Sequence, residues 1–185
     1  MKEFYTIDIA GMQRDLPLCP LNDSLYIGAF VMFGDVELTV HCARQLLKIA
    51  PDYDVLITAE SKGIPLGYEM AKQRGDATYL LARKAPKLYM QNCQKVEVQS
   101  ITTEKRQELY IDQKDMDQMK GRRVLIVDDV ISTGESLHAL EKLVEAAGGN
   151  IVGKMAVLAE GDAAARKDIL FLQKLPLFNA QGEAI

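Results

Sequence analysis

Short apolar runs alternate with amphipathic segments along the middle of the chain. Four runs have the length and composition of buried strands, at residues 55–58, 78–82, 124–127 and 151–158. Apolar residues recur with helical spacing in three segments, at about 35–49, 64–74 and 135–147. Strands that alternate with helices of this length favour crossover connections, which place parallel strands in one sheet. The sequence therefore predicts an α/β fold with a mostly parallel sheet and helices on both of its faces.

The first predicted helix has a cap and a candidate buried stripe. Asp35 stands where a side chain can accept a hydrogen bond from the first turn. The apolar residues that follow it at helical spacing are Val36, Val40, Ala43 and Leu47. We expect this stripe to face the core.

The region between residues 84 and 120 interrupts the alternation, because it has no convincing helical period. Residues 96–101 alternate between apolar and polar side chains, and residues 108–111 can pair with them. This pattern predicts a two-stranded projection or a hood-like loop. We expect residues 84–108 to be the most flexible segment of the chain.

The terminal segments fit neither the strand nor the helix pattern well. Residues 1–34 and 160–178 are apolar and contain Pro17, Pro20 and Pro176. We expect them to pack together as a small hood on a core of about residues 35–160. With no repeat or linker in its 185 residues, the chain is expected to form a single domain.

Composition narrows the class of protein. The longest apolar run, residues 25–33, is well below the roughly 18 residues of a membrane span, and no signal peptide is recognisable, so we expect a cytoplasmic protein without membrane contact. Neither a disulfide framework nor a zinc site is indicated. The cysteines and histidines, which lack metal-binding spacing, are Cys19, Cys42, Cys93, His41 and His138.

The net charge of −4 argues against a general nucleic-acid-binding protein, because no global positive field would attract phosphates. Residues 83–123 nevertheless hold ten Lys or Arg against six Asp or Glu. This local excess suits a compact polyanion, although ordinary solvated lysines account for it equally well.

Residues 124–137, Val-Leu-Ile-Val-Asp-Asp-Val-Ile-Ser-Thr-Gly-Glu-Ser-Leu, carry the most specific chemistry. The turn from Ser132 to Ser136 offers successive backbone N–H groups and hydroxyls at a helix N-terminus, which suits a phosphate monoester. Asp128 and Asp129 accept hydrogen bonds when ionised, so they suit sugar hydroxyls or a divalent cation. A phosphorylated sugar satisfies both halves of this pattern.

Other interpretations of this stretch are possible. A plain strand, turn and capped helix would use the same residue types. A receiver domain has a similar start, but too few residues and no further strand-ending aspartate follow Val127. A Walker-type loop is excluded because the chain has no Gly-x4-Gly-Lys-Ser/Thr pattern.

The stretch resembles the signature of the type I phosphoribosyltransferases, which is an apolar run, two acids, three variable residues, Thr-Gly, one residue, and Ser or Thr. That family binds phosphoribosyl pyrophosphate (PRPP) at this signature. The resemblance implies that Asp128 and Asp129 hold the ribose 2′ and 3′ hydroxyls. The residues that it places around the 5′-phosphate are Ser132, Thr133, Gly134, Glu135 and Ser136. The family usually has a small residue in place of Glu135, so the backbone amide of this residue should make the contact.

Two further loops agree with the resemblance. The sequence Ala-Glu-Ser-Lys-Gly at residues 59–63 resembles the family's pyrophosphate loop, which often contains a cis peptide. The residues implied to bind pyrophosphate there are Glu60, Ser61, Lys62 and Gly63. Arg83 and Lys84 resemble the basic pair that the adenine branch places against pyrophosphate, and with the acid pair they are the implied catalytic residues. Either loop alone would also be an ordinary surface turn.

The implied reaction transfers the phosphoribosyl group from PRPP to a ring nitrogen of a purine and releases pyrophosphate, as in purine salvage. Mg²⁺ would be held through PRPP oxygens and water, with Asp128 and Asp129 as candidate protein ligands. The segment from residue 84 to 108 would close over PRPP. A homodimer is implied, because relatives commonly complete each other's sites.

Adenine is the favoured acceptor by resemblance. Enzymes for 6-oxopurines such as xanthine place a lysine after the last core strand, whereas this chain has Ala159-Glu160-Gly161 there. The candidates for the base pocket, each of which has an equally good packing or surface role, are Arg14, Leu16, Ile131 and Glu160. A 6-oxopurine enzyme and a non-catalytic PRPP-sensing regulator are the alternatives. A regulator would be expected to carry a DNA-binding extension or a concentrated basic face.

Overall fold

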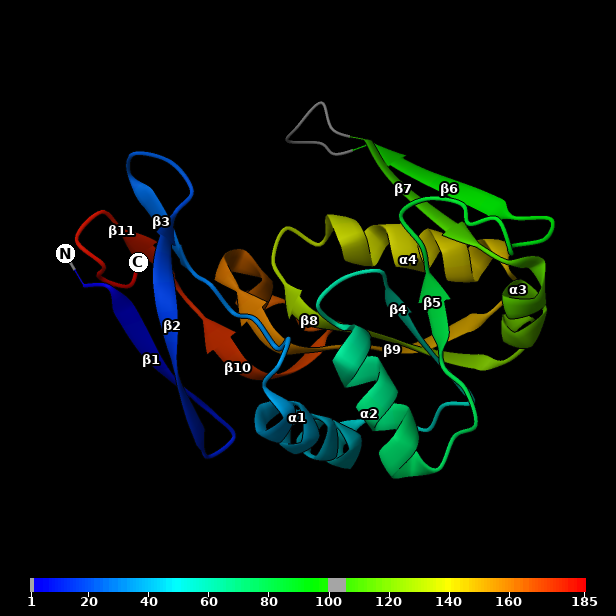
Figure 1. The fold of residues 1–185 in the computed structure, drawn as a ribbon, viewed down its shortest axis with the longest axis horizontal. Coiled ribbons are helices and arrows are strands. Elements are labelled where there is room, and N and C mark those ends of the chain that lie inside the picture. The colour runs from blue at the N-terminus through cyan, green and yellow to red at the C-terminus, as the bar shows by residue number, and fades with distance from the viewer. Residues whose placement is uncertain (1, 100–105) are drawn as a thin grey trace.

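The computed structural model describes residues 2–99 and 106–185 (Figure 1). Five parallel strands form the central sheet in the order β10-β9-β8-β4-β5. Their bounds are Val55–Ala59 for β4, Leu80–Ala82 for β5, Arg123–Ile131 for β8, Asn150–Glu160 for β9 and Leu170–Leu175 for β10. The prediction of an α/β fold with a parallel sheet is confirmed.

Helices cover both faces of this sheet and create two core layers. On one face lie α1 (Val36–Ile49) and α2 (Ile64–Arg74), and on the other lies α4 (Glu135–Ala146). Side chains of successive strand residues point to opposite faces. Leu125 accordingly packs in the layer of α1 and α2, whereas Ile126 packs in the layer of α4.

Helix α1 begins as predicted but buries a different stripe. The Asp35 carboxylate caps it by accepting a hydrogen bond from the Leu38 N–H at 3.0 Å. The predicted stripe was right at Ala43, which is buried, and in part at Leu47, which packs partly buried against the core, but it was wrong at Val36, which is 72% exposed. The residues buried on this helix are Leu38, Thr39, Cys42, Ala43 and Leu46. Two overlapping apolar stripes run along this helix, and only the packing partner selects between them.

The hood is a separate four-stranded antiparallel sheet with the order β1-β2-β3-β11. Its strands are β1 (Phe4–Ile9), β2 (Met12–Pro20), β3 (Leu25–Gly28) and β11 (Leu177–Asn179). The expectation that residues 160–178 belong entirely to the hood was wrong, because β10 extends the central sheet beside β9. Only β11 crosses into the hood, after Pro176 separates the two strands.

A hairpin stands over α4, made of β6 (Gln94–Gln99) and β7 (Arg106–Ile111). Val96 pairs with Leu109 in its antiparallel register, which confirms the predicted two-stranded projection. Part of the predicted flexible segment, residues 100–105, lies outside the described residues. The short helix α3 (Gln113–Met119) was missed, because its seven residues are too few to show a period.

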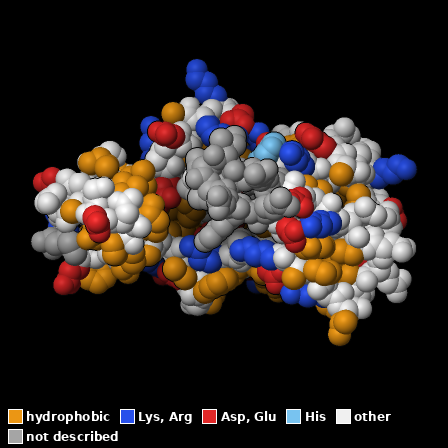
Figure 2. Space-filling view, turned by 90° about the horizontal axis from the view of Figure 1, so that it is seen from above, with side chains coloured by type: hydrophobic (Ala, Val, Ile, Leu, Met, Phe, Trp, Pro, Cys, Tyr) orange, Lys and Arg blue, Asp and Glu red, His pale blue; other side chains and the backbone are white. Residues whose placement is uncertain are grey.

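The surface of the described residues has a mixed charge. Figure 2 shows apolar side chains gathered on the hood, while Lys and Arg side chains lie among Asp and Glu side chains over the core. None of the helices in the described ranges is long and apolar enough to cross a membrane. Among the described side chains in Figure 2, no broad patch of a single charge is seen.

Candidate active site

The predicted site residues gather at one edge of the central sheet, because all its strands are parallel and their carboxyl ends meet there. Strand β8 continues four residues beyond its predicted end, so the acid pair lies within the strand, near its carboxyl end. Asp128 and Asp129 are only 8% and 4% exposed. The pair is therefore held by the strand itself rather than by a loop.

Contacts from the loop after β4 fix the acid pair. The Asp128 Oδ1 atom accepts hydrogen bonds from the Ser61 hydroxyl at 3.0 Å and from the Asp129 N–H at 2.9 Å. The Lys62 Nζ atom lies 3.5 Å from Asp129 Oδ2, an oxygen that is buried and has no hydrogen-bond partner among the described residues. One acceptor atom of the pair is therefore poised to receive a donor.

The two carboxyl groups influence each other electrostatically. Burial, followed by the neighbouring charge of Asp129, raises the pKa of Asp128 to about 7. The hydrogen bonds from the Asp129 N–H and the Ser61 hydroxyl act in the opposite direction. A ligand that supplies donors or positive charge to the pair would favour the ionised form of both groups.

The turn after β8 forms a small cradle. Gly134 has φ +82°, a conformation that favours glycine, and α4 begins at the next residue. A cavity of about 170 Å³ is enclosed by residues 130–137 together with Asp128. The first turn of an α-helix leaves backbone N–H groups that the helix itself does not use, and in α4 this turn lies at the cradle. Those N–H groups and the helix dipole make the cradle suitable for an anion.

The predicted pyrophosphate loop, residues 60–63, joins β4 to α2 beside the acid pair. A Cβ atom on Gly63 would stand 3.0 Å from both Asp128 Oδ1 and Thr58 Oγ1, so only glycine fits there without a shift. The peptide bonds of the described residues are all trans, including the one between Glu60 and Ser61. Lys62 does not face the basic pair, since its Nζ atom donates to the Phe30 carbonyl at 2.7 Å.

Glu60 joins this loop to the basic pair. Its carboxylate accepts a hydrogen bond from the Lys84 N–H at 2.9 Å and lies 3.2 Å from Arg83 Nη2 and 3.8 Å from Lys87 Nζ. The Lys84 N–H is the main cause of the lowered pKa of Glu60; burial opposes it, and the charges of Arg83 and Lys87 assist. The Glu60 carboxylate is thus an anionic group already bound by these basic residues. The Arg83 Nε atom is buried and has no hydrogen-bond partner among the described residues.

A cleft of about 330 Å³ opens between the hood and the acid pair. Glu160, a predicted candidate for the base pocket, lines this cleft, and burial raises the pKa of its carboxyl while Lys62 opposes the shift. Ile131 lines the neighbouring cradle. The cleft residues that sequence reasoning did not single out for the base are Ile27, Gly28, Ala29, Phe30, Ser61, Lys62, Val130 and Leu175.

Two predicted base-pocket residues are placed elsewhere. The Arg14 guanidinium pairs with Asp35 at 2.7 Å and with Glu37 at 2.9 Å, so it links the hood to α1. Leu16 is 4% exposed and packs beneath Gly28, behind the cleft. The structure therefore does not bring Arg14 into the cleft, and Leu16 only packs behind the Gly28 backbone that lines it. Strand pairing within the hood decides both positions, and no local sequence signal announces it.

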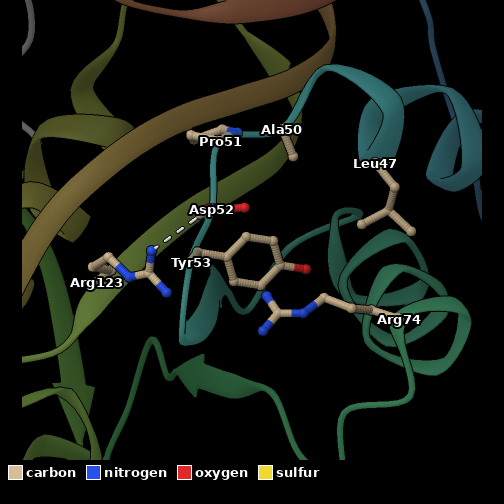
Figure 3. Close-up of a pocket in the computed structure, with 7 residues that line it drawn as sticks. All are labelled: Leu47, Ala50, Pro51, Asp52, Tyr53, Arg74 and Arg123. Atoms are coloured by element: carbon tan, nitrogen blue, oxygen red, sulfur yellow. Dashed lines mark ion pairs between the residues drawn. The ribbon is translucent and has the colours of Figure 1, made fainter.

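A second cavity, of about 540 Å³, lies at the opposite edge of the sheet and differs in character (Figure 3). The Arg74 guanidinium lies 3.7 Å above the Tyr53 ring and pairs with Asp76 at 3.3 Å. Arg123 pairs with Asp54 at 2.8 Å. Both arginines are thus neutralised within the protein, so this cavity lacks the free donors of the cradle.

The chain is similar to several known proteins. The profile of the phosphoribosyl transferase domain matches residues 38–181. A hypoxanthine/guanine phosphoribosyltransferase of Methanococcus voltae is 34% identical over 143 residues, covering 77% of this chain and 70% of that protein. An adenine phosphoribosyltransferase of Thermotoga petrophila is 29% identical over 156 residues, covering 83% of this chain and 88% of that protein. A solved adenine phosphoribosyltransferase from Thermoanaerobacter pseudethanolicus has a TM-score of 0.62 at 23% identity, covering 77% of this chain and 84% of that one.

The parallel sheet brings an acid pair, a turn at a helix N-terminus and a basic loop to one edge, and this arrangement is suited to an anionic ligand. The profile covers well over half of the chain, and the chain belongs to the phosphoribosyltransferase family. This membership confirms the resemblance noted in the sequence and the prediction that the chain is an enzyme of this type.

Proposed function

We propose that this enzyme transfers the 5-phosphoribosyl group of PRPP to a purine base, with adenine favoured, and releases pyrophosphate. One observation carries the proposal: the Ser61 hydroxyl donates to Asp128 at 3.0 Å, which ties the pyrophosphate loop directly to the acid pair. The cradle at residues 132–136 begins only three residues after the pair. A ligand with a diphosphate, a pentose and a 5′-phosphate would meet all three parts in that order.

In this proposal the protein acts through position and charge. Asp128 and Asp129 hold the ribose hydroxyls, the cradle holds the 5′-phosphate, and Arg83 with Lys84 attracts the departing pyrophosphate. As the bond from the anomeric carbon to the pyrophosphate oxygen breaks, the purine nitrogen forms a new bond to that carbon from the opposite face. Glu60 would have to release Arg83 as the diphosphate enters, because the anionic groups compete for the same guanidinium.

The residues of the acid pair fit a magnesium ion held mainly through the substrate. The buried Asp129 Oδ2 atom has no hydrogen-bond partner, which suits an oxygen ligand. No cluster of three or more His, Cys, Asp or Glu side chains forms a complete metal site within residues 2–99 and 106–185. Asp128 and Asp129 would therefore hold Mg²⁺ together with PRPP oxygens and water. The ion would neutralise charge on the leaving pyrophosphate.

The choice of base depends on two side chains in the cleft. Glu160 supplies an acceptor that suits the amino group of adenine. Lys62 supplies a donor that suits the carbonyl of a 6-oxopurine, which is the observation that favours the second candidate. The similar proteins carry both names, hypoxanthine/guanine and adenine phosphoribosyltransferase. Adenine is favoured because the Phe30 carbonyl and Asp129 already engage the Lys62 amine.

We also propose that the enzyme is a homodimer. Val36 and Tyr68 are 72% and 56% exposed and line one largely apolar cavity of about 490 Å³ between α1 and α2. A second copy would remove this apolar surface from water. Light scattering during gel filtration should give twice the chain mass, and Val36→Glu should shift the protein to a monomer. A wild-type protein that elutes as a monomer at all concentrations would contradict the dimer.

A panel assay tests the reaction. Purified protein is incubated with PRPP, Mg²⁺ and one radiolabelled base at a time, using adenine, hypoxanthine, xanthine, guanine and orotate. We expect AMP and pyrophosphate as the main products. Product from hypoxanthine or guanine alone would select the 6-oxopurine candidate. Tight binding of PRPP with no product from any base would replace the enzyme with a PRPP sensor.

A further inference from the structure

Arg166 lies against the phosphate cradle although it is 32 positions away from Gly134 in the sequence. It directly follows the short 3-10 helix η1 (Gly161–Ala165). Its Nη1 atom is 2.8 Å from the point where a Cβ atom on Gly134 would stand. The guanidinium therefore occupies the space that a side chain at Gly134 would fill.

A carboxylate holds this guanidinium in a fixed orientation. Arg166 donates from Nε to Asp168 Oδ1 at 2.9 Å and from Nη2 to Asp168 Oδ2 at 2.7 Å. This two-point contact is a rigid arrangement, and it is also the main cause of the raised pKa of Arg166. Nε and Nη2 are both engaged, whereas the structure gives Nη1, the nitrogen beside Gly134, no hydrogen-bond partner among the described residues.

The same carboxylate is anchored to the helix that the cradle begins. Lys154 on β9 contacts Asp168 at 2.5 Å and Glu141 on α4 at 2.7 Å. The chain of charges from Arg166 through Asp168 and Lys154 to Glu141 thus ends on α4. Movement of Arg166 relative to the cradle would require this chain of ion pairs to break.

Charge explains what Arg166 adds. The cradle and its approach carry Asp128, Asp129 and Glu135 but neither lysine nor arginine from residue 124 to 141. Without Arg166, backbone N–H groups and hydroxyls, which carry no net charge, would have to hold a phosphate dianion beside these acids. A guanidinium at the same turn offsets the negative charge and presents a planar donor, which phosphate oxygens accept well.

We propose that Arg166 is a phosphate-binding residue, which donates from Nη1 to the 5′-phosphate held in the cradle. Asp168 is its positioning residue. This inference rests on the proposed function, because it assumes that the cradle binds the phosphate of a ribose ester. Arg166 is 32% exposed in its side chain, so a ligand entering from solvent can reach it.

Calorimetric titration with ribose 5-phosphate tests the proposal. Arg166→Gln removes the charge but keeps a polar side chain, and we expect it to weaken ribose 5-phosphate binding about tenfold. Arg166→Lys should recover part of the affinity. Lys167→Gln is the matched control, because it makes the same change in net charge at an exposed neighbour and should bind as the wild type does. Pyrophosphate binding should be unchanged in all these variants.

Asp168→Asn keeps the charge of Arg166 but loosens its orientation, and we expect a loss of about threefold for ribose 5-phosphate. Thermal unfolding would reveal whether Arg166→Gln folds poorly. In that case the affinity of Asp168→Asn for ribose 5-phosphate still tests the role of Arg166. Wild-type affinity in Arg166→Gln, or an equal loss for ribose 5-phosphate and pyrophosphate, would overturn the inference and leave the proposed function standing. A wild-type protein that binds no ribose 5-phosphate would overturn the proposed function and the inference with it.

Discussion

Replacement of Asp128 by Asn should make the protein more stable at neutral and alkaline pH. The buried Asp128 carboxyl has its pKa raised from its ordinary value of 3.8 to about 7, because burial and the charge of Asp129 oppose its ionisation. The folded protein therefore holds this proton at pH values where the unfolded chain has lost it. Stability from the group is complete below pH 4 and is lost as the pH rises through 7.

The size of the effect follows from that difference in pKa. Between pH 4.5 and 6.5 the folded state binds one more proton than the unfolded state, so the free energy of unfolding should fall by roughly 1.4 kcal/mol per pH unit from this group. Over the whole window the loss approaches roughly 4 kcal/mol, as an upper bound for a carboxyl coupled to its neighbour. Asn removes the ionisation while its amide oxygen can still accept from the Ser61 hydroxyl.

Urea unfolding of the wild type and of Asp128→Asn, at pH values from 5 to 8.5, measures this difference. We expect the variant to lose most of the pH slope and to exceed the wild type by several kcal/mol at pH 8. Asp117→Asn makes the same change in charge at an exposed position and should keep the wild-type slope. A variant less stable than the wild type at pH 8, or one with an unchanged slope, would refute the reasoning. The same variant should lose catalysis, because the ribose hydroxyls need an ionised acceptor.

Three further changes test other parts of the site. Gly63→Ala places a Cβ atom 3.0 Å from Asp128 Oδ1. We therefore expect the KM for PRPP to rise about tenfold in steady-state kinetics. An unchanged KM would show that the loop can shift to accommodate the methyl group without weakening PRPP binding. Arg14→Gln breaks the ion pair with Asp35, in which both side chains are about a quarter exposed. We expect it to lower the free energy of unfolding by about 1 kcal/mol and to leave the KM for the base unchanged. A raised KM for the base with unchanged stability would instead place Arg14 in the base pocket. Glu160→Gln should lower kcat/KM for adenine about tenfold and leave hypoxanthine within threefold, and an equal loss for both bases would remove Glu160 from base selection.

Strands β4, β5, β8 and β9 of the central sheet could be predicted from the sequence because they are continuous apolar runs that end at turns. The residues 124–136 were predictable for the same reason, since a strand, an acid pair and a hydroxyl-rich turn follow one another without a gap. Parallel pairing then brings residues 60–63 and Arg83 to the same edge. Local sequence and one topological rule were sufficient for this part of the site.

The hood and the cleft could not be predicted in the same way. Leu175 reaches the cleft only because β10 joins the central sheet and β11 crosses to β3, and no local pattern specifies either pairing. Phe30 follows β3, a strand of only four residues, which is too short to show alternation. Arg166 meets Gly134 through a long-range fold-back, so its place beside the cradle depends on tertiary packing alone.

The central claim is that residues 132–136 bind the 5′-phosphate while Asp128 and Asp129 hold the ribose. A crystal structure of the protein soaked with ribose 5-phosphate tests this claim most directly. The account predicts phosphate oxygens within hydrogen-bonding distance of the backbone N–H groups of Thr133, Gly134 and Glu135, and ribose hydroxyls against the two carboxylates. Density for the ligand at another surface, with the cradle closed by side chains, would contradict it.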